Sequence, residues 1–335
     1  MPCQAIEGLL QSGAIALEMP LSDGQIQPAS LDLRLGRSAY RVRASFLPRP
    51  GEKVDAKLAD LALHRIDLSE GAVLETGCVY LVPLLERLAL APDIAASANP
   101  KSSTGRLDVF TRVIADGVSA FDQVPAGYVG GLYAEICPQT FPIVAHTGSR
   151  LCQIRFRQGP QSVADMRNVD LSVDLAGAGD GLAGYRAKRH TGVIDVDRPR
   201  GYDADDFWEP IRQRSGERRL ILDPDQFYIL ASKESVVVPA DEAAEMVPFN
   251  PLVGEFRVHY AGFFDPGFGL AASGGTGARA VLEVRSHTVP FILEDGQIIG
   301  RLVYEPLTST PSRLYGAGLG SHYQAQGLKL SKHFK

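Results

Sequence analysis

A short polar run carries the residue types with the most evident chemistry in this chain. The run "NPKSSTGRLDV", residues 99–109, places Lys101, Ser102, Ser103 and Arg106 around a glycine, between two stretches that predict β-strands. Hydroxyls, backbone N–H groups beside a glycine and a forked guanidinium are the groups that bind phosphate oxygens. We interpret the run as a phosphate-binding loop. An ordinary polar turn is the alternative that the loop alone leaves open.

The elements that must position this loop are mainly β. Short β-branched and aromatic runs are separated by Gly and Pro, which is typical of an all-β sandwich or barrel. Helical periodicity predicts only two short helices, over residues 4–11 and 239–246. The runs that predict strands are "CVYLVPL", "GLYAEI", "RLCQIRF", "ESVVVP", "AVLEV" and "IIGRLVYEP".

Two stretches of the chain repeat at a fixed spacing. "LETGCVYLVPLLERLALAPDIA" resembles "LDPDQFYILASKESVVVPADEA", and "YAEICPQTFPIVAHTGSRLCQIRF" resembles "VLEVRSHTVPFILEDGQIIGRLVY". We infer a duplicated β unit, with units over 1–160 and 161–335 and a charged linker or arm over about 186–219. Four pairs of identical residues stand 148 positions apart: Tyr80 and Tyr228, Glu135 and Glu283, Pro142 and Pro290, Gly148 and Gly296.

The two copies differ in complementary ways. The second copy has "FNPLVGEFRV" near the position of the phosphate loop, without the two serines and the arginine. Only the second copy has "HYAGFFDPGFG", residues 259–269, with an Asp-Pro-Gly turn ahead of "VLEV". A single active site that draws on both copies explains this pattern better than two independent sites.

Composition excludes several functional classes. The 335 residues are 45% hydrophobic with a formal net charge of −5, which argues against a broad nucleic-acid-binding face. The apolar runs are too short to cross a membrane, and the N-terminus lacks the pattern of a signal peptide. The four cysteines are far apart and form no CxxC pair, so we expect free thiols. These features predict a cytoplasmic protein.

With its motifs in order, the chain resembles the dCTP deaminase family of the dUTPase-like superfamily. The motifs are "QPASLDLRLG" (27–36), Ser-Ser-x-x-Arg (102–106), "FFDPGF" (263–268), "VLEV" (281–284), "GQIIGRLVYEPL" (296–307) and "SHYQAQGLKLSKHF" (321–334). The resemblance implies two tandem dUTPase-like β-barrel or β-clip units with a few short helices. It also implies a homo-oligomer and inhibition by dTTP, while the family's usual chain carries one unit and forms homotrimers.

The resemblance also implies a reaction, the deamination of dCTP to dUTP and ammonia. Glu283 would activate the water that attacks C4 of cytosine, Ser102 would hold that water, and Arg106 would orient Glu283 or bind phosphate. Lys101 and Ser103 would hold the triphosphate. The chain has neither the H-x-E nor the P-C-x-x-C signature of zinc deaminases, so the expected route uses no zinc.

The same resemblance implies a substrate-binding segment and a lid. The hairpin from Ala261 to Asp265 would frame the base and sugar, with Asp265 at the deoxyribose hydroxyl. Mg²⁺ would arrive with the triphosphate, and Asp32 would be structural or would help to arrange that ion. The residues expected to close over the nucleotide or reach its phosphates are Tyr315, His322, Tyr323 and Gln326.

Other assignments remain open. Asp265 also suits a dUTPase or a bifunctional enzyme that releases dUMP and pyrophosphate, and a non-catalytic nucleotide-binding module is a further alternative. Glu283 could be a solvent-facing strand residue, and Glu135 is either a vestige or part of a second site.

Overall fold

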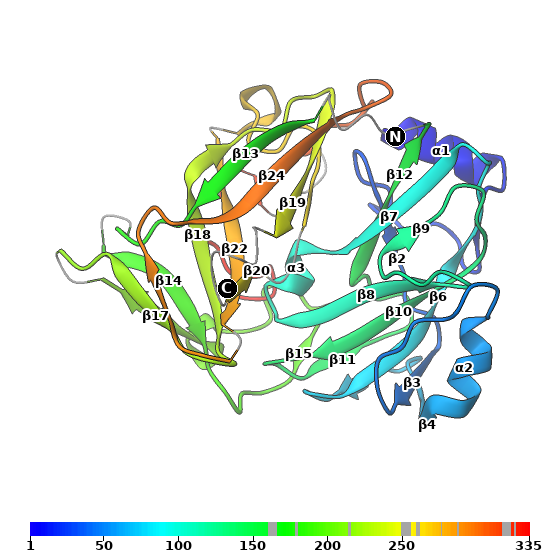
Figure 1. Ribbon diagram of the computed structural model, residues 1–335, viewed down its shortest axis with the longest axis horizontal. Coiled ribbons are helices and arrows are strands. Elements are labelled where there is room, and N and C mark those ends of the chain that lie inside the picture. The colour runs from blue at the N-terminus through cyan, green and yellow to red at the C-terminus, as the bar shows by residue number, and fades with distance from the viewer. Residues whose placement is uncertain are drawn as a thin grey trace. The chain divides into compact units, whose positions relative to one another are not determined.

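The computed structural model describes residues 1–159, 166–177, 180–213, 216–248, 256–258, 262–275, 277–286, 288–316, 323–324 and 326–335. The chain divides into two compact units. Unit 1 comprises Met1–Ser162, Gly192–Pro199 and Leu307–Arg313, and unit 2 comprises Val163–Thr191, Arg200–Pro306 and Leu314–Lys335. As predicted, the protein is mainly β with a few short helices (Figure 1).

Three sheets build unit 1. The largest has the order β4 (Ala62–Asp67), β3 (Ser38–Val42), β6 (Val79–Ala89), β10 (Val129–Pro138) and β8 (Val109–Ala115), and β1 (Ile15–Leu17) also pairs with β6. The second has the order β2 (Leu31–Leu33), β12 (Cys152–Gln158), β7 (Ile94–Pro100) and β9 (Gln123–Val124). The third has the order β15 (Ile194–Asp195), β11 (Ile143–Ala145) and β5 (Ala72–Leu74).

Unit 2 has a closely related set of sheets. One has the order β13 (Arg167–Ser172), β24 (Ile298–Pro306), β19 (Glu242–Pro248) and β21 (Phe263–Phe264). Another has the order β16 (Trp208–Arg212), β14 (Leu182–Ala187), β18 (Phe227–Val236), β22 (Ala278–Ser286) and β20 (Phe256–Val258). The third pairs β17 (Arg219–Leu222) with β23 (Phe291–Glu294). The hydrophobic core of unit 2 includes Leu230, Leu282 and Leu302, which come from the first two of these sheets.

The repeat found in the sequence extends to the pairing of the strands. In unit 1 β10 sets Ile136 opposite Tyr80 of β6, and in unit 2 β22 sets Val284 opposite Tyr228 of β18, each 148 positions later. The same spacing of 148 positions relates the pairing of β5 with β11 to that of β17 with β23. It also relates the pairing of β7 with β12 to that of β19 with β24. Even a turn contact recurs, because the Tyr80 hydroxyl accepts the N–H of Glu75 at 3.0 Å and the Tyr228 hydroxyl accepts that of Asp223 at 3.0 Å.

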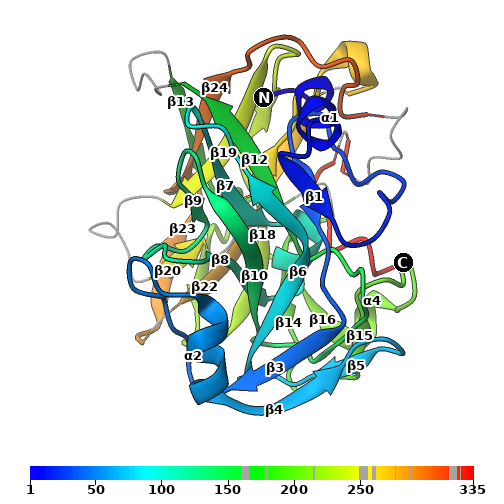
Figure 2. The same cartoon turned by 90° about the vertical axis from the view of Figure 1, so that its right-hand side faces the viewer.

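The helices agree only in part with the prediction. The helix expected over 4–11 is α1 (Cys3–Gln11), which buries Cys3, Ile6 and Leu9 along one face. A helix that the sequence reading missed, α2 (Val54–Leu61), buries Val54 and Leu58 against β3 and β6 of the main sheet (Figure 2). In the described part of the chain, further short turns of helix are α3 (Ser102–Gly105), α4 (Ala204–Phe207) and a 3₁₀ turn, Ala271–Ser273.

The helix predicted over 239–246 is wrong. Strand β19 begins at Glu242 instead and pairs with β24 on one side and β21 on the other. Its residues Ala243, Ala244 and Met246 are buried. The alanine- and glutamate-rich composition favours a helix only weakly, and backbone pairing on both edges outweighs that preference.

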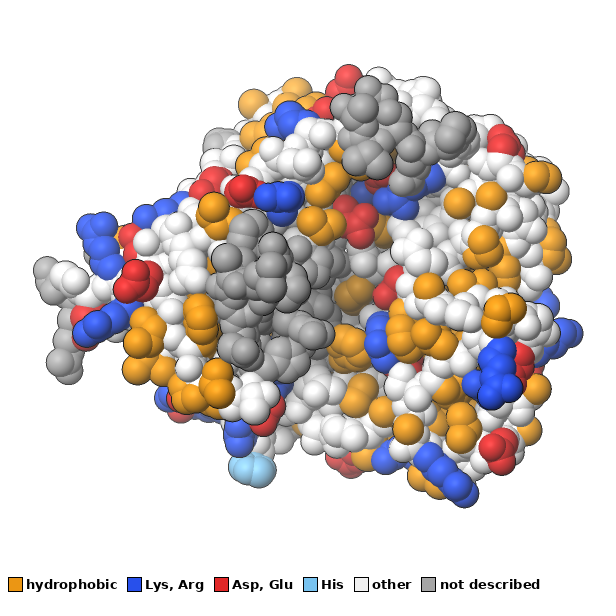
Figure 3. All heavy atoms as spheres, viewed as in Figure 1, with side chains coloured by type: hydrophobic (Ala, Val, Ile, Leu, Met, Phe, Trp, Pro, Cys, Tyr) orange, Lys and Arg blue, Asp and Glu red, His pale blue; other side chains and the backbone are white. Residues whose placement is uncertain are grey.

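The expectations drawn from composition concern the cysteines, membrane-spanning segments and surface charge. All four cysteines are free thiols, as expected. No helix in the described part of the chain is long and apolar enough to span a bilayer. On the face in Figure 3, acidic and basic side chains are interspersed in small groups.

Candidate functional site

The predicted phosphate loop lies between two strands, as expected. Strand β7 ends at Pro100, Lys101 precedes the single helical turn α3, and β8 begins at Val109. The turn is closed by backbone hydrogen bonds from Thr104 N–H to Lys101 C=O, 2.8 Å, and from Arg106 N–H to Ser102 C=O, 3.1 Å. Lys101 and Ser102 are half-buried, whereas Ser103 and Arg106 are buried. The structure therefore gathers the four predicted residues on one tight turn.

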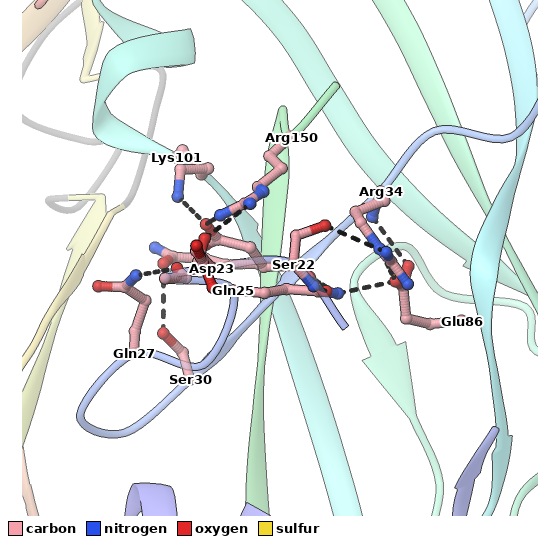
Figure 4. Close-up of polar contacts among 12 residues, drawn as sticks. Ser22, Asp23, Gln25, Gln27, Ser30, Arg34, Glu86, Lys101 and Arg150 are labelled. Carbon is pink, nitrogen blue, oxygen red and sulfur yellow. Dashed lines mark hydrogen bonds and ion pairs between the residues drawn. The ribbon is translucent and has the colours of Figure 1, made fainter. Parts of the chain in front are cut away.

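A buried carboxylate holds the basic group of this loop. The Lys101 ammonium donates to Asp32 Oδ2, and Arg150 Nη1 lies 3.6 Å from the same oxygen (Figure 4). Asp32 is only 1% exposed, and the two cations offset the cost of burying its charge. Arg150 stands in the turn before β12 and was missed by the sequence reading. Position 298, 148 residues later, is an isoleucine, so this cation is specific to unit 1.

A second buried pair positions the strand that carries Asp32. Arg34 Nε donates to Glu86 Oε1 at 2.7 Å, and the Arg34 backbone N–H donates to Oε2 at 2.8 Å. Gln25 Nε2 bridges the two clusters, because it donates to Glu86 Oε1 at 2.8 Å and to the Asp32 carbonyl at 3.0 Å (Figure 4). Burial raises the pKa of Glu86 despite the hydrogen bonds from Arg34, which lower it. Gln25, Arg34 and Glu86 thus hold the strand of Asp32 through a network of buried hydrogen bonds.

Glu283 lies in the interior of unit 2. It occupies the middle of β22, opposite Ile229 of β18, and is 4% exposed. Its neighbours Leu282 and Val284 are fully buried. The alternative of a solvent-facing glutamate is therefore wrong. A buried carboxyl group is a candidate for general acid–base chemistry.

Glu135 occupies the matching position in unit 1, and its surroundings are described. Arg112 of the adjacent strand β8 donates to Glu135 Oε1 from Nη2 at 2.5 Å and from Nε at 3.1 Å. The Arg112 guanidinium also stacks on the ring of Phe121, with 3.4 Å between its carbon and the ring centroid. This carboxylate is engaged in a structural ion pair. In unit 2 the corresponding stretch after β20 lies outside the described residues.

The Asp-Pro-Gly turn of unit 2 is tightly packed. Asp265 is 8% exposed, and its carbonyl accepts the N–H of Phe268 at 3.1 Å. Gly269 has φ +69°, and a Cβ there would lie 2.2 Å from the Val236 carbonyl oxygen, so only glycine fits. Ala261, predicted at the start of this hairpin, lies outside the described residues.

The C-terminal tail contacts this turn. Tyr315 N–H donates to the Pro266 carbonyl at 2.8 Å, and its ring packs against Phe268 with 5.7 Å between centroids. Tyr323 N–H donates to the Tyr315 hydroxyl at 3.2 Å. Gln326 instead exchanges hydrogen bonds with the backbone of Arg279 on β22. His322 lies outside the described residues.

The sequence reading missed Gln324 as a contact of the turn. Its amide donates to the carbonyls of Gly267 and Ser273 at 3.1 and 3.2 Å, and its oxygen accepts the Gly269 N–H at 3.1 Å. The tail motif contained this residue, but nothing in the spacing separated it from Gln326. Within unit 2 the structure thus brings together Asp265, Tyr315 and Tyr323 through the turn and the tail.

Comparisons with known proteins agree with these motifs. A model of the 2'-deoxycytidine 5'-triphosphate deaminase (DCD) C-terminal domain matches residues 141–334, and a model of the DCD N-terminal domain matches residues 1–160. Together the two models span almost the whole chain.

Individual relatives point the same way. A "dCTP deaminase, dUMP-forming" of Coprothermobacter proteolyticus is 29% identical over 152 residues, 45% of this chain and 77% of its own. A "dCTP deaminase" of Natronomonas pharaonis is 30% identical over 156 residues, 44% of this chain and 75% of its own. The crystal structure of 2'-deoxycytidine 5'-triphosphate deaminase from Agrobacterium tumefaciens is 58% identical, with a TM-score of 0.86, over 92% of this chain and 98% of its own. The chain therefore belongs to the 2'-deoxycytidine 5'-triphosphate deaminase family.

Proposed function

We propose that this protein deaminates dCTP hydrolytically, giving dUTP for the synthesis of dUMP and dTTP, with release of ammonia. Membership of the family supports the substrate and the reaction. The observation that carries the proposal is Glu283, a carboxyl group buried in the middle of β22 between fully buried apolar residues. Burial of a carboxyl group costs free energy, and a buried carboxyl group is a candidate for acid–base chemistry.

In the proposed mechanism Glu283 acts as a general base and then as a general acid. It takes one proton from water as the oxygen attacks C4 of cytosine and passes that proton to N3. It then takes the remaining proton of the new C4 hydroxyl and passes it to the departing amino group. The C4–N4 bond breaks and ammonia leaves, so that atoms and charges balance without a metal-bound hydroxide. Ser102 holds the water, and Arg106 orients the carboxylate or binds phosphate.

The triphosphate is assigned to the basic turn of unit 1. Lys101 and Ser103 were predicted for this role, and Arg150 joins them because it approaches the same buried carboxylate, that of Asp32. The Lys101 and Arg150 side chains are 19% and 27% exposed, so both retain access to solvent while Asp32 restrains them. Charge-assisted hydrogen bonds of this kind contribute about 1.5–3 kcal/mol each.

The base, the sugar and the lid are assigned to unit 2. Ala261 to Asp265 would frame the cytidine, with Asp265 at the sugar hydroxyl. The lid would consist of Tyr315, Tyr323 and Gln326, with His322 near the phosphates, and its closure would exclude water from the reaction.

Mg²⁺ is proposed to enter with the triphosphate, as its counter-ion. Asp32 does not suit a resident ion, because Oδ2 already faces two cationic side chains. Of the two roles predicted for Asp32, the contacts favour the structural one. We assign no Mg²⁺ ligand to the protein.

A second candidate product is dUMP. Relatives named dUMP-forming and relatives named dCTP deaminase both match this chain, and Asp265 is a candidate for orienting a second water at the α-phosphorus. A non-catalytic nucleotide-binding module is disfavoured because Ser102, Arg106 and Glu283 are all present. Homo-oligomer formation and inhibition by dTTP are proposed on the resemblance. A cytoplasmic location is proposed on the composition, and a duplicated origin of the two units on the 148-residue repeat together with the resemblance.

The proposal is tested by resolving the products of dCTP by ion-exchange chromatography while ammonia is assayed. We expect dUTP and ammonia in equal amounts. If dUMP and pyrophosphate form as well, the enzyme is bifunctional, and if dCTP is not consumed by folded protein, the proposal is wrong.

A further inference from the structure

Strand pairing in unit 1 brings together a histidine and two aspartates that the proposed reaction does not use. Strands β11 and β15 are parallel, with Ile143 opposite Ile194 and Val144 opposite Asp195. Parallel neighbours end at the same edge of a sheet, so His146, just after β11, meets Asp195 and Asp197 at the end of β15. Their nearest ligand atoms all lie within 4.8 Å of one another.

The geometry of this cluster suits a metal ion. His146 Nδ1 lies 3.2 Å from Asp197 Oδ2 and 3.8 Å from Asp195 Oδ1. A tetrahedral zinc ion with ligands at 2.0–2.1 Å separates its ligand atoms by about 3.3 Å. The Asp197 spacing is close to that value, the Asp195 spacing is longer, and the two carboxylate oxygens lie within 4.8 Å of each other, so an ion would draw the Asp195 side chain inward. All three side chains are partly exposed, between 31% and 46%, which leaves a path for entry.

The imidazole is held with Nδ1 toward the carboxylates. Its Nε2 edge lies over Gly71, where a Cβ would come within 2.4 Å of Nε2, and Gly71 has φ +83°. The ring packs on this glycine only because position 71 has no side chain. Ser149, buried at 2% exposure, donates its hydroxyl to Asp197 Oδ2 and accepts the backbone N–H of His146 at 2.8 Å. Hydrogen bonds of this kind orient the carboxylate ligands of metal sites.

We propose that His146, Asp195 and Asp197 bind one divalent transition-metal ion such as Zn²⁺, with water completing its coordination. One neutral imidazole and two carboxylates balance a doubly charged ion and supply the nitrogen and oxygen ligands that such ions prefer. The site is a feature of unit 1 alone, since position 294 is a glutamate and the described residues of unit 2 show no strand equivalent to β15. The ion would tie the segment Gly192–Pro199 to β11.

The test is a zinc titration of the full chain, purified without a histidine tag, treated with EDTA and desalted. A competing chromophoric chelator reports affinity and stoichiometry. We expect one saturable site, weakened about tenfold or more in His146→Ala and in Asp197→Asn. His64→Ala, which removes an exposed histidine on β4, and Ser149→Ala, which removes a hydrogen bond but no ligand, should each keep the stoichiometry of one.

Two further measurements make the result independent of folding in the variants. Zn²⁺ should raise the melting temperature of the wild type but not that of His146→Ala, with circular dichroism confirming that both are folded. In the wild type, Co²⁺ should shift the ring-proton resonances of His146 more than those of the other histidines. Absence of saturable binding, or binding of equal affinity in His146→Ala and wild type, would overturn the proposal and leave an ordinary His–Asp ion pair.

Discussion

Glu135 and Glu283 occupy the same register position in two equivalent strand pairs, opposite Leu81 in one unit and Ile229 in the other. Both are buried, at 2% and 4% exposure. Glu135 is paired with Arg112, whereas Glu283 lies in the unit that carries the Asp-Pro-Gly turn and the C-terminal tail. The glutamate at this repeated position thus forms an ion pair in unit 1, and in our proposal it acts as the acid–base group in unit 2.

These two glutamates give a matched pair of substitutions. Glu283→Gln should lower kcat for dCTP by about 10²–10⁴-fold, because a positioned acid–base group contributes that much. Glu135→Gln should keep its turnover and lose about 1–3 kcal/mol of unfolding free energy, since Arg112 loses a charged partner. Steady-state kinetics and urea denaturation of both variants measure these effects. Equal kinetic losses in the two variants would remove the distinction between them.

Asp32 should affect substrate binding through the cations that it restrains. Asp32→Asn should raise KM for dCTP about tenfold or more, with a smaller change in kcat, because Lys101 and Arg150 lose the carboxylate that places them. The control is Asp170→Asn. Asp170 faces Arg301 on β24 as Asp32 faces Gln153 on β12, but its ion pair with Arg301 is exposed, so we expect no kinetic change. An unchanged KM in Asp32→Asn would contradict this role.

The buried pair of Arg34 and Glu86 should govern part of the stability. Arg34→Met leaves the Glu86 charge buried without its partner and should cost about 3–5 kcal/mol of unfolding free energy. Urea denaturation followed by circular dichroism measures it. The exposed pair of Arg186 and Glu209 provides the comparison, and Arg186→Met should cost less than about 1 kcal/mol.

The same pair predicts a pH dependence. Burial raises the pKa of Glu86, so the folded protein keeps this proton at a pH where the unfolded chain has lost it. The contribution of Glu86 to the unfolding free energy is therefore present at low pH and is lost as pH rises through the raised pKa. Urea denaturation at a series of pH values from about pH 4 to about pH 7 measures this loss. The unfolding free energy of the wild type should fall more steeply with rising pH than that of Glu86→Gln. Identical slopes in the two proteins would count against it.

Substitutions at two glycines near the Asp-Pro-Gly turn distinguish the cost of backbone strain from the cost of a steric clash. Gly269 and Gly274 both have positive φ, +69° and +83°, but only at Gly269 would a Cβ meet a neighbour, the Val236 carbonyl oxygen at 2.2 Å. Gly269→Ala should therefore cost about 1–3 kcal/mol more unfolding free energy than Gly274→Ala. Comparable losses in the two variants would show that the turn relaxes around the added methyl group.

Local patterns in the sequence predicted much of the framework. The apolar spacing of Ile6 and Leu9 marked α1, and each of the six apolar runs overlaps a strand. The 148-residue repeat holds down to the pairing of individual residues because strand register is set by which side chains face the core.

Other features depend on contacts that are distant in the sequence. Strand β19 was misread because pairing on both of its edges is invisible in "PADEAAEM". Helix α2 was missed, and its first N–H is bound by Asp116, far along the chain, at 2.8 Å. The approach of Arg150 to Asp32 likewise joins residues that no motif links. Local spacing in the sequence therefore located the loops whose residues could bind substrate or take part in catalysis. It did not locate the side chains that hold those loops in place.

The most direct test of the central claim compares the wild type with Glu283→Gln and Ser102→Ala, each incubated with dCTP and Mg²⁺. Products are resolved by ion-exchange chromatography beside an ammonia assay, and circular dichroism confirms folding. The account predicts stoichiometric dUTP and ammonia from the wild type and a loss of both in each variant. Unchanged turnover of dCTP in both variants would contradict it.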